Sequence, residues 1–172
     1  VPEIGDWCAV DLLRPNNEIE SVAIAHTDPR KVQWAQEVRR RFPPSLEGPA
    51  GVAAVIRNSA PEYQFVITDE MMEESSIDEE SRQIVREIGF RSYLAVPLNA
   101  RGATIGALTL VCTRESNRYF DEADVLFASE IAGRVAIAVD NALLYEEART
   151  ARQQQGALLA QLEALFANAP IG

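Results

Sequence analysis

Apolar residues form two long runs in the second half of the chain, followed by a helical pattern. The stretch from Gly89 to Leu144 predicts a strand, a tight turn, a second strand, a loop and one long helix. The strands, residues 93–98 and 104–113, are apolar on both faces, and residues 100–102 predict the hairpin turn between them. Strands of this kind are expected in a sheet that is covered on both sides.

The first half of the chain predicts a hairpin and several helices. Two runs of alternating apolar and polar residues, 7–13 and 19–27, predict a pair of strands joined by a turn. Asp28 followed by Pro29 predicts the start of a helix that reaches Phe42, because both residue types are favoured at a helix amino terminus. The remaining pattern predicts a short helix at 52–58, a short strand at 64–68, an exposed acidic segment at 71–78, and a helix at 79–88 that Gly89 ends.

The last predicted helix is unusually long. It opens at Asp121, with Asp124 three residues later as a weak form of capping box, and Phe120 is placed to contact Val125 as a hydrophobic staple. A helix over residues 121–166 would be about 69 Å long at roughly 1.5 Å per residue. We therefore expect it to extend beyond a domain of this size.

Small apolar residues recur along this helix at spacings of three and four, which is typical of a heptad seam. The polar segment 146–155 and Gly156 interrupt that phase, and leucines return at positions 158, 162 and 165 in another phase. We expect the helix to pack on its own sheet as far as Val139 and to meet a partner helix beyond it. The residues assigned to this dimer and signalling helix are Val125, Ala128, Ala132, Val135, Val139 and Ala142.

Composition narrows the classes of function. The chain has 172 residues, a net charge of −10 and 47% hydrophobic residues, which suits one soluble domain with an extension. The acidic balance argues against nucleic-acid binding, and no apolar run approaches the roughly 20 residues of a membrane span. Cys8 and Cys112 lie far apart in strand-like segments, which fits a reducing, cytoplasmic compartment. They are interpreted as small core residues, with a redox or attachment role as the alternative.

The sequence lacks an evident catalytic or metal-binding constellation. One histidine and two separated cysteines do not make an ordinary metal site, and no nucleophile motif is present. His26 is either a packed, hydrogen-bonded side chain or a ligand contact. The loop at 46–51 precedes a helix and could accept an anion. The acidic residues between Asp69 and Glu80 are interpreted as a solvated face. We therefore expect a regulatory domain rather than an enzyme.

Taken together, these segments resemble GAF domains, the small-molecule sensor modules of signalling proteins. The resemblance lies in the order and spacing of five segments: DWCAVDLL at 6–13, VITDE at 66–70, GFRSYLAVPL at 89–98, TIGALTLV at 104–111 and FDEADVLFASEIAGRVAIAVDNALLYEEA at 120–148. It implies an α+β fold with a central antiparallel sheet, helices on both faces and a long carboxy-terminal helix. It also implies a pocket between the sheet and the middle helices, away from the long helix.

The resemblance also predicts how the chain is divided. Residues 1–145 form the sensor domain, 146–166 a signalling or coiled-coil helix, and 167–172 the start of a following domain, because EALFANAPIG at 163–172 resembles the opening of a PAS domain. This arrangement implies a cytoplasmic homodimer within a sensor histidine kinase or a cyclic-dinucleotide enzyme. Adjacent PAS-like and output domains and an unknown small molecule are the expected partners, without nucleic acid or membrane contact from this segment.

Only some of the functional residues known in GAF domains have counterparts in this sequence. The pocket elements of the family place these residues in the expected pocket: Trp34, Val52, Ile56, Asp69, Ile84, Arg91, Tyr93 and Thr109. No cofactor is identified, and the absence of a Cys-His pair argues against a covalent bilin. The segment 117–122 is similar to part of the cyclic-nucleotide branch, with arginine for lysine, but helix capping explains it without a nucleotide.

Three hypotheses remain open at this stage. The first is a sensory module whose ligand changes the packing of the long helix. The second is a structural dimerisation module without a ligand. The third is an enzyme of the sulfoxide-reductase kind, which would depend on Cys8 and Cys112.

Overall fold

The computed structural model describes residues 4–71, 79–116 and 118–167. The chain divides into two compact units, Val1–Ala136 and Ile137–Gly172. In the first unit, the described residues form a five-stranded sheet of order β2-β1-β5-β4-β3, in which all neighbours are antiparallel. Its strands are β1 (Trp7–Leu13), β2 (Ile19–His26), β3 (Glu62–Gln64), β4 (Phe90–Ala100) and β5 (Ala103–Thr113). The helices are α1 (Pro29–Arg41), α2 (Val52–Asn58), α4 (Glu79–Ile88) and α5 (Glu122–Ala167).

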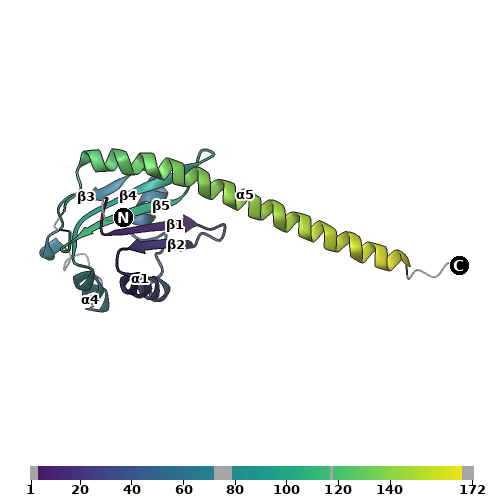
Figure 1. The fold of residues 1–172 in the computed structure, drawn as a ribbon, viewed down its shortest axis with the longest axis horizontal. Helices are drawn as coiled ribbons and strands as arrows, with labels where there is room; N and C mark the ends of the chain where they lie inside the picture. Colours follow the sequence, from purple (N-terminus) through teal and green to yellow (C-terminus); the bar gives the residue numbers. More distant parts are fainter. Residues whose placement is uncertain (1–3, 72–78, 117, 168–172) are drawn as a thin grey trace. The chain divides into compact units, whose positions relative to one another are not determined.

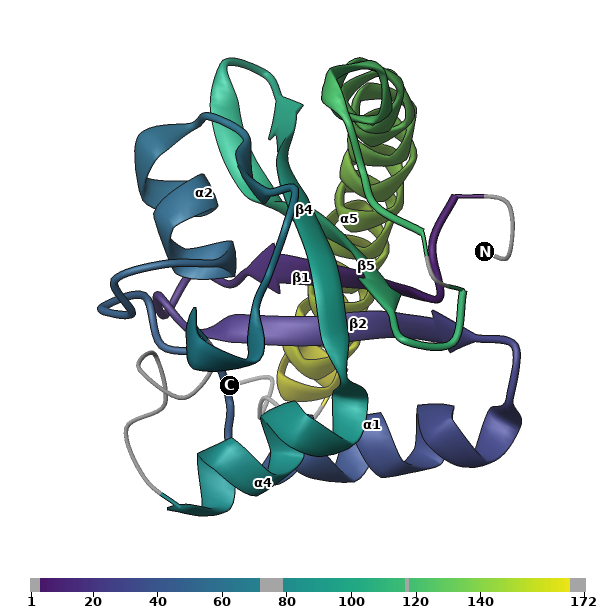
Figure 2. The same ribbon diagram turned by 90° about the vertical axis from the view of Figure 1, so that its left-hand side faces the viewer.

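This architecture confirms the predicted α+β fold with a long carboxy-terminal helix. Helix α5 has 46 residues, of which those up to Ala136 belong to the first unit. Figure 1 shows the first turns of α5 on one side of the sheet and α1 and α4 on the other. In Figure 2, β4 and β5 run between α2 and the first turns of α5. None of the described helices has the length and apolar content needed to cross a membrane.

The two faces of the sheet carry side chains of different size, and each face receives a helix that complements it. On the α2 face, the small residues Ala95 and Ala107 leave room for larger helix side chains. On the other face, the sheet presents large residues and the helix α5 contributes alanines. The fully buried residues of that layer are Leu94, Val96 and Leu98 from β4, and Ala128, Ala132 and Ala136 from α5.

Local signals fixed several boundaries as predicted. Asp28 caps α1 by accepting a hydrogen bond from the backbone N–H of Arg30 at 2.9 Å, and proline occupies the first turn. The β4–β5 turn places Arg101 and Gly102 at φ 49° and 78°, the left-handed conformation that tight hairpins require. Gly89 ends α4 at φ 68°.

The start of α5 is a reciprocal capping box. The backbone N–H of Asp121 donates to Asp124 Oδ2 at 3.0 Å, and the N–H of Asp124 donates to Asp121 Oδ1 at 3.0 Å. Phe120, immediately before the cap, is buried, and its N–H donates to Ser92 Oγ at 2.9 Å. These bonds tie the helix start to β4.

The strand predicted at residues 64–68 is wrong in position. Strand β3 is Glu62–Gln64, which pairs with β4. Beyond it, one bond to β4 continues, from the N–H of Ile67 to the carbonyl of Arg91 at 2.8 Å, while the Val66 side chain is 54% exposed. The apolar run suggested a buried strand, but the ladder follows the register set by β4. Most of the predicted acidic segment, 72–78, lies outside the described residues.

Candidate functional site

A cavity of about 380 Å³ lies between the sheet and the helices α1 and α2. Strands β1, β2, β4 and β5 form its floor, and the 44–51 segment and the end of α4 complete its wall. Side chains along a strand point alternately to the two faces of the sheet, which determines the sheet residues that line the cavity. Tyr93 pairs with Val111, and Ala9 pairs with Thr109, so these side chains lie on the same face of neighbouring strands.

Aromatic and aliphatic side chains make most of the cavity wall. The rings of Trp7 and Trp34 lie 6.3 Å apart between centroids and are tilted by 53°. Trp7 also contacts His26, with ring centroids 4.4 Å apart. Ala35 and Val38 from α1 extend the apolar surface. This wall suits a flat or apolar ligand body.

Two buried hydroxyl groups line the floor of this cavity. Tyr93 Oη and Thr109 Oγ1 have no hydrogen-bond partner among the described residues. Burial, with a further contribution from the Glu62 carboxylate, raises the pKa of Tyr93, so that its hydroxyl stays neutral. Buried polar atoms are nearly always hydrogen-bonded in folded proteins, so unpartnered ones in a cavity indicate a position for a polar ligand or water.

A partly buried ion pair joins α1 to β1 at the cavity edge. Arg39 Nη2 lies 3.5 Å from Asp11 Oδ2, and the Asp11 side chain is fully buried. Neither oxygen of Asp11 has a hydrogen bond among the described residues, and the same is true of Ser21 Oγ on the adjacent strand. Arg39 lines the cavity, whereas Asp11 does not.

The amino terminus of α2 is occupied by the chain's own carboxylate. The N–H of Gly51 donates to Glu62 Oε1 at 2.7 Å. The helix end that could accept an anion is therefore bound by the chain's own Glu62, and the bond fixes β3 against the loop before α2.

The structure places the eight predicted pocket residues in different environments. Trp34, Val52, Tyr93 and Thr109 line the cavity. The other four do not line it. Ile56 packs in the apolar cluster under α2, Asp69 pairs with Arg114 at 2.5 Å, and Ile84 borders a separate groove between α1 and α4. The Nε of Arg91 is buried without a hydrogen-bond partner among the described residues.

Sequence reasoning missed Arg39 and Trp7. Arg39 belongs to a run of three arginines that was interpreted as favourable charge at a helix carboxyl end. Its position four residues after Ala35 places it on the inward stripe of α1, and that helical phase could have identified it. Trp7 has the same phase as Ala9 along β1, so the alternation of that strand could have identified it.

The residues assigned to the signalling helix fall in two different units of the structure. Ala128 and Ala132 are fully covered within the first unit, as expected for a helix that packs on its own sheet, and Val125 and Val135 are partly buried. Val139 and Ala142 belong to the second unit. The large apolar side chain that α5 leaves most exposed in the first unit is Leu126, at 74%.

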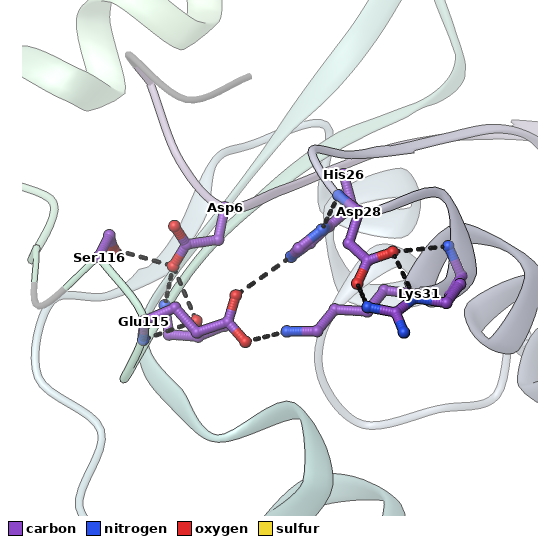
Figure 3. Close-up of polar contacts among 8 residues, drawn as sticks. Asp6, His26, Asp28, Lys31, Glu115 and Ser116 are labelled. Carbon is purple, nitrogen blue, oxygen red and sulfur yellow. Dashed lines mark hydrogen bonds and ion pairs between the residues drawn. The ribbon is translucent and has the colours of Figure 1, made fainter.

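A second polar cluster lies beside the cavity and is shown in Figure 3. Asp6 Oδ2 accepts hydrogen bonds from the N–H and hydroxyl of Thr113, at 2.6 and 2.8 Å, and from the hydroxyl of Ser116 at 2.8 Å. Burial raises the pKa of Asp6, but these hydrogen bonds outweigh burial and hold that pKa below its usual range. The cluster ties the start of β1 to the loop after β5.

His26 is part of the same cluster. Its Nδ1 accepts from the N–H of Asp28 at 2.9 Å, and its Nε2 lies 3.6 Å from Glu115 Oε2. Glu115 also pairs with Lys31 (Figure 3). Because His26 does not line the cavity and packs on Trp7, the packed, hydrogen-bonded interpretation fits it.

The cysteines offer little support for redox catalysis. Both are free, and Cys8 pairs in register with Leu110 rather than with Cys112. Burial raises the pKa of Cys8 and raises the pKa of Cys112 to about 11, so both thiols are protonated at neutral pH. Among the described residues, no group of three or more histidine, cysteine or acidic side chains could hold a metal ion.

One family model matches most of the chain. The model of the GAF domain family matches residues 5–139. A comparison with curated protein sequences finds no significant match.

Solved structures of similar fold include three from bacteria. The GAF-B domain of DevS from Mycobacterium smegmatis is 18% identical, with 83% of this chain and 85% of that chain covered and a TM-score of 0.56. A domain of a putative two-component sensor histidine kinase from Sinorhizobium meliloti 1021 is 15% identical (85% and 86% covered, TM-score 0.55). A GAF domain/HD domain protein from Geobacter sulfurreducens is 19% identical (81% and 83% covered, TM-score 0.58). At these identities the likeness shows the shared fold.

Proposed function

This chain belongs to the GAF domain family, and we propose that it is a non-catalytic sensory domain of a bacterial-type signalling protein that binds a small molecule in the cavity beside α1 and α2. The observation that carries the proposal is the cavity itself. Its volume of about 380 Å³ falls within the range of small-molecule pockets, about 300–1,000 Å³. Its wall is mainly apolar, and two hydroxyls on its floor have no partner among the described residues.

The signal would leave the domain through α5. A ligand shifts a conformational equilibrium only if it binds one arrangement better than another. Helix α5 starts at a capping box tied to β4, the strand that also carries Tyr93 into the cavity. A ligand that moves β4 would therefore move the start of α5, and a paired helix in a homodimer would carry the change to an output domain.

We also propose what kind of protein this domain belongs to. The fold is shared with a domain of a putative two-component sensor histidine kinase, which supports a sensor-kinase parent. A cyclic-dinucleotide enzyme is the alternative parent, and a cytoplasmic location is proposed with either. A PAS-like domain would follow residue 167; the last residues of the tail that suggests it, 168–172, lie outside the described part of the chain.

Native mass spectrometry of the purified 172-residue chain tests the proposal. We expect a dimer that carries additional small-molecule mass, or an empty dimer that a metabolite library stabilises in a thermal-shift screen. A chain that purifies empty and that no library compound stabilises would contradict ligand sensing.

The second candidate is a structural dimerisation module without a ligand. The observation that favours it is the exposed apolar surface of α5 in the second unit, where Leu158, Leu162 and Leu165 are exposed. This function predicts an empty dimer whose affinity is unchanged when the cavity is filled by a larger side chain, such as Ala35→Leu. A sensory domain predicts loss of ligand mass in the same variant.

A further inference from the structure

We propose that the cavity selects a small carboxylate with a flat, apolar body, and that Arg39 binds the carboxylate group. This inference rests on the proposed sensory function and adds the chemical class of the ligand. It depends on the charge, hydrogen-bonding capacity and shape of the same cavity.

The charge of the cavity favours an acid. Arg39 is the one charged side chain among the described residues that line it. A guanidinium group has five N–H donors in a planar fork that matches a carboxylate, and such pairs form charge-assisted, often bidentate hydrogen bonds. A cationic ligand would meet this guanidinium without a compensating acidic side chain in the cavity lining.

Asp11 acts as a positioning group for Arg39. It lies outside the cavity lining and contacts Arg39 through one nitrogen, at 3.5 Å. Among the described residues, this ion pair is the only polar contact of Arg39, so its N–H donors remain for a ligand. Because Asp11 is fully buried, its charge also holds the guanidinium close to the sheet.

The two floor hydroxyls complete the recognition of the acid. Tyr93 Oη and Thr109 Oγ1 are buried and have no partner among the described residues. Since burial raises the pKa of Tyr93, its hydroxyl keeps a proton that it can donate to a carboxylate oxygen. Two neutral donors in the same cavity as the guanidinium lower the cost of bringing a second carboxylate near Asp11.

The walls select the body of the ligand. Trp7 and Trp34 present two rings at an angle of 53°, and Val38 and Val52 add aliphatic surface. A planar ring can contact such walls over its faces and edges, whereas a strongly hydrated polar body would lose its water there without new hydrogen bonds.

The test compares acids with their own amides. Isothermal titration calorimetry on the 172-residue chain would use benzoate, phenylacetate and indole-3-acetate, each beside its primary amide and the corresponding amine. We expect at least one acid to bind about tenfold more tightly than its amide, because charge-assisted hydrogen bonds are roughly twice as strong as neutral ones. Equal or tighter binding of the amides or amines, or no binding of any acid at millimolar concentration, would overturn the inference.

Variants locate the effect. The double variant Arg39→Gln, Asp11→Asn replaces the ion pair by two neutral side chains of similar size, which avoids an unpaired buried carboxylate. It should lose the preference for the acid, and Tyr93→Phe should reduce it. Arg40→Gln is the matched control, since Arg40 is the next residue, is exposed and pairs with Glu37. A preference that survives in the double variant would contradict the role of Arg39.

The two proposals can fail separately. If native mass spectrometry finds a bound neutral molecule, sensing stands and the carboxylate inference fails. If no compound of any class binds or co-purifies, the sensory function fails as well.

Discussion

Gly106 of β5 lies directly against the backbone of Asp11 in β1. A Cβ atom added at position 106 would lie 2.2 Å from the carbonyl oxygen of Asp11 and 2.9 Å from a methyl carbon of Leu12. A glycine here lets β1 and β5 approach while Asp11 keeps its position beneath Arg39. We predict that Gly106→Ala lowers the free energy of unfolding by at least about 1–3 kcal/mol, the usual cost of overpacking a core.

Urea unfolding followed by tryptophan fluorescence would measure this change. The matched control is Gly133→Ala in α5, where an added Cβ meets nothing within 4 Å. That substitution should stabilise the chain by about 0.5–1 kcal/mol, because alanine is the better helix former. A Gly106→Ala variant as stable as the parent would show that β1 can move away from β5 at little cost.

The second prediction concerns His26 and pH. Burial lowers the pKa of His26 from its usual 6.5, and Lys31 lowers it further, while Asp6 and Asp28 raise it. Glu115, near Nε2, is the remaining charged group that faces the ring (Figure 3). Because the folded state then binds fewer protons than the unfolded state near this pH, stability is present above 6.5 and falls as pH is lowered through the folded pKa.

Proton NMR can follow this titration without ambiguity, since the chain contains one histidine. We expect a midpoint below 6.5 and a stability that declines from neutral to mildly acidic pH. In His26→Gln, the decline in this window should be smaller. A midpoint above 6.5 would mean that Glu115 and the other carboxylates outweigh burial.

The third prediction concerns the cap of α5. Asp121 Oδ1 accepts from the N–H of Ala123 at 2.8 Å and of Asp124 at 3.0 Å. We predict that Asp121→Ala costs about 0.5–2 kcal/mol of stability, whereas Asp121→Asn retains most of it, because asparagine caps comparably. Thermal unfolding of both variants beside Glu122→Ala, an exposed first-turn neighbour, makes the comparison. Equal losses for alanine and asparagine would indicate that charge, rather than capping, matters here.

These positions show why parts of the fold were predictable from sequence. Caps and turns depend on a few consecutive residues. The helix cap at Asp28 and the turns at Gly89 and Gly102 could therefore be predicted from the local sequence. The position of β3 depends instead on its pairing with β4, far away in sequence. The local pattern therefore placed that strand on the apolar residues 64–68, and the ladder placed it at Glu62–Gln64.

The cavity residues were likewise only partly predictable from the sequence. Tyr93 and Thr109 were expected there because the resemblance to GAF domains places β4 and β5 among the pocket elements, and the pairing of these strands puts both side chains on the cavity face. Ile56 was placed there because the short helix at residues 52–58 was among the pocket elements that the resemblance implies, but its side chain packs in the cluster under that helix. Arg39 was missed because the arginine run was interpreted as favourable charge at the helix carboxyl end, although its helical phase with Ala35 places it on the inward face; its pairing with Asp11 on another element is not visible in a local pattern.

The final prediction concerns the second unit, where α5 exposes leucines at heptad-like spacing. Leu158, Leu162 and Leu165 are 58%, 41% and 65% exposed in the single chain. If the proposed homodimer forms through this part of the helix, these side chains become buried between two copies. We predict that replacing all three with glutamine converts the dimer to a monomer in sedimentation velocity, without changing the unfolding of the first unit. Leu126→Gln, an exposed change within the first unit, should leave the dimer intact. A triple variant that remains dimeric would move the interface to the Leu126 side of α5 or to another surface.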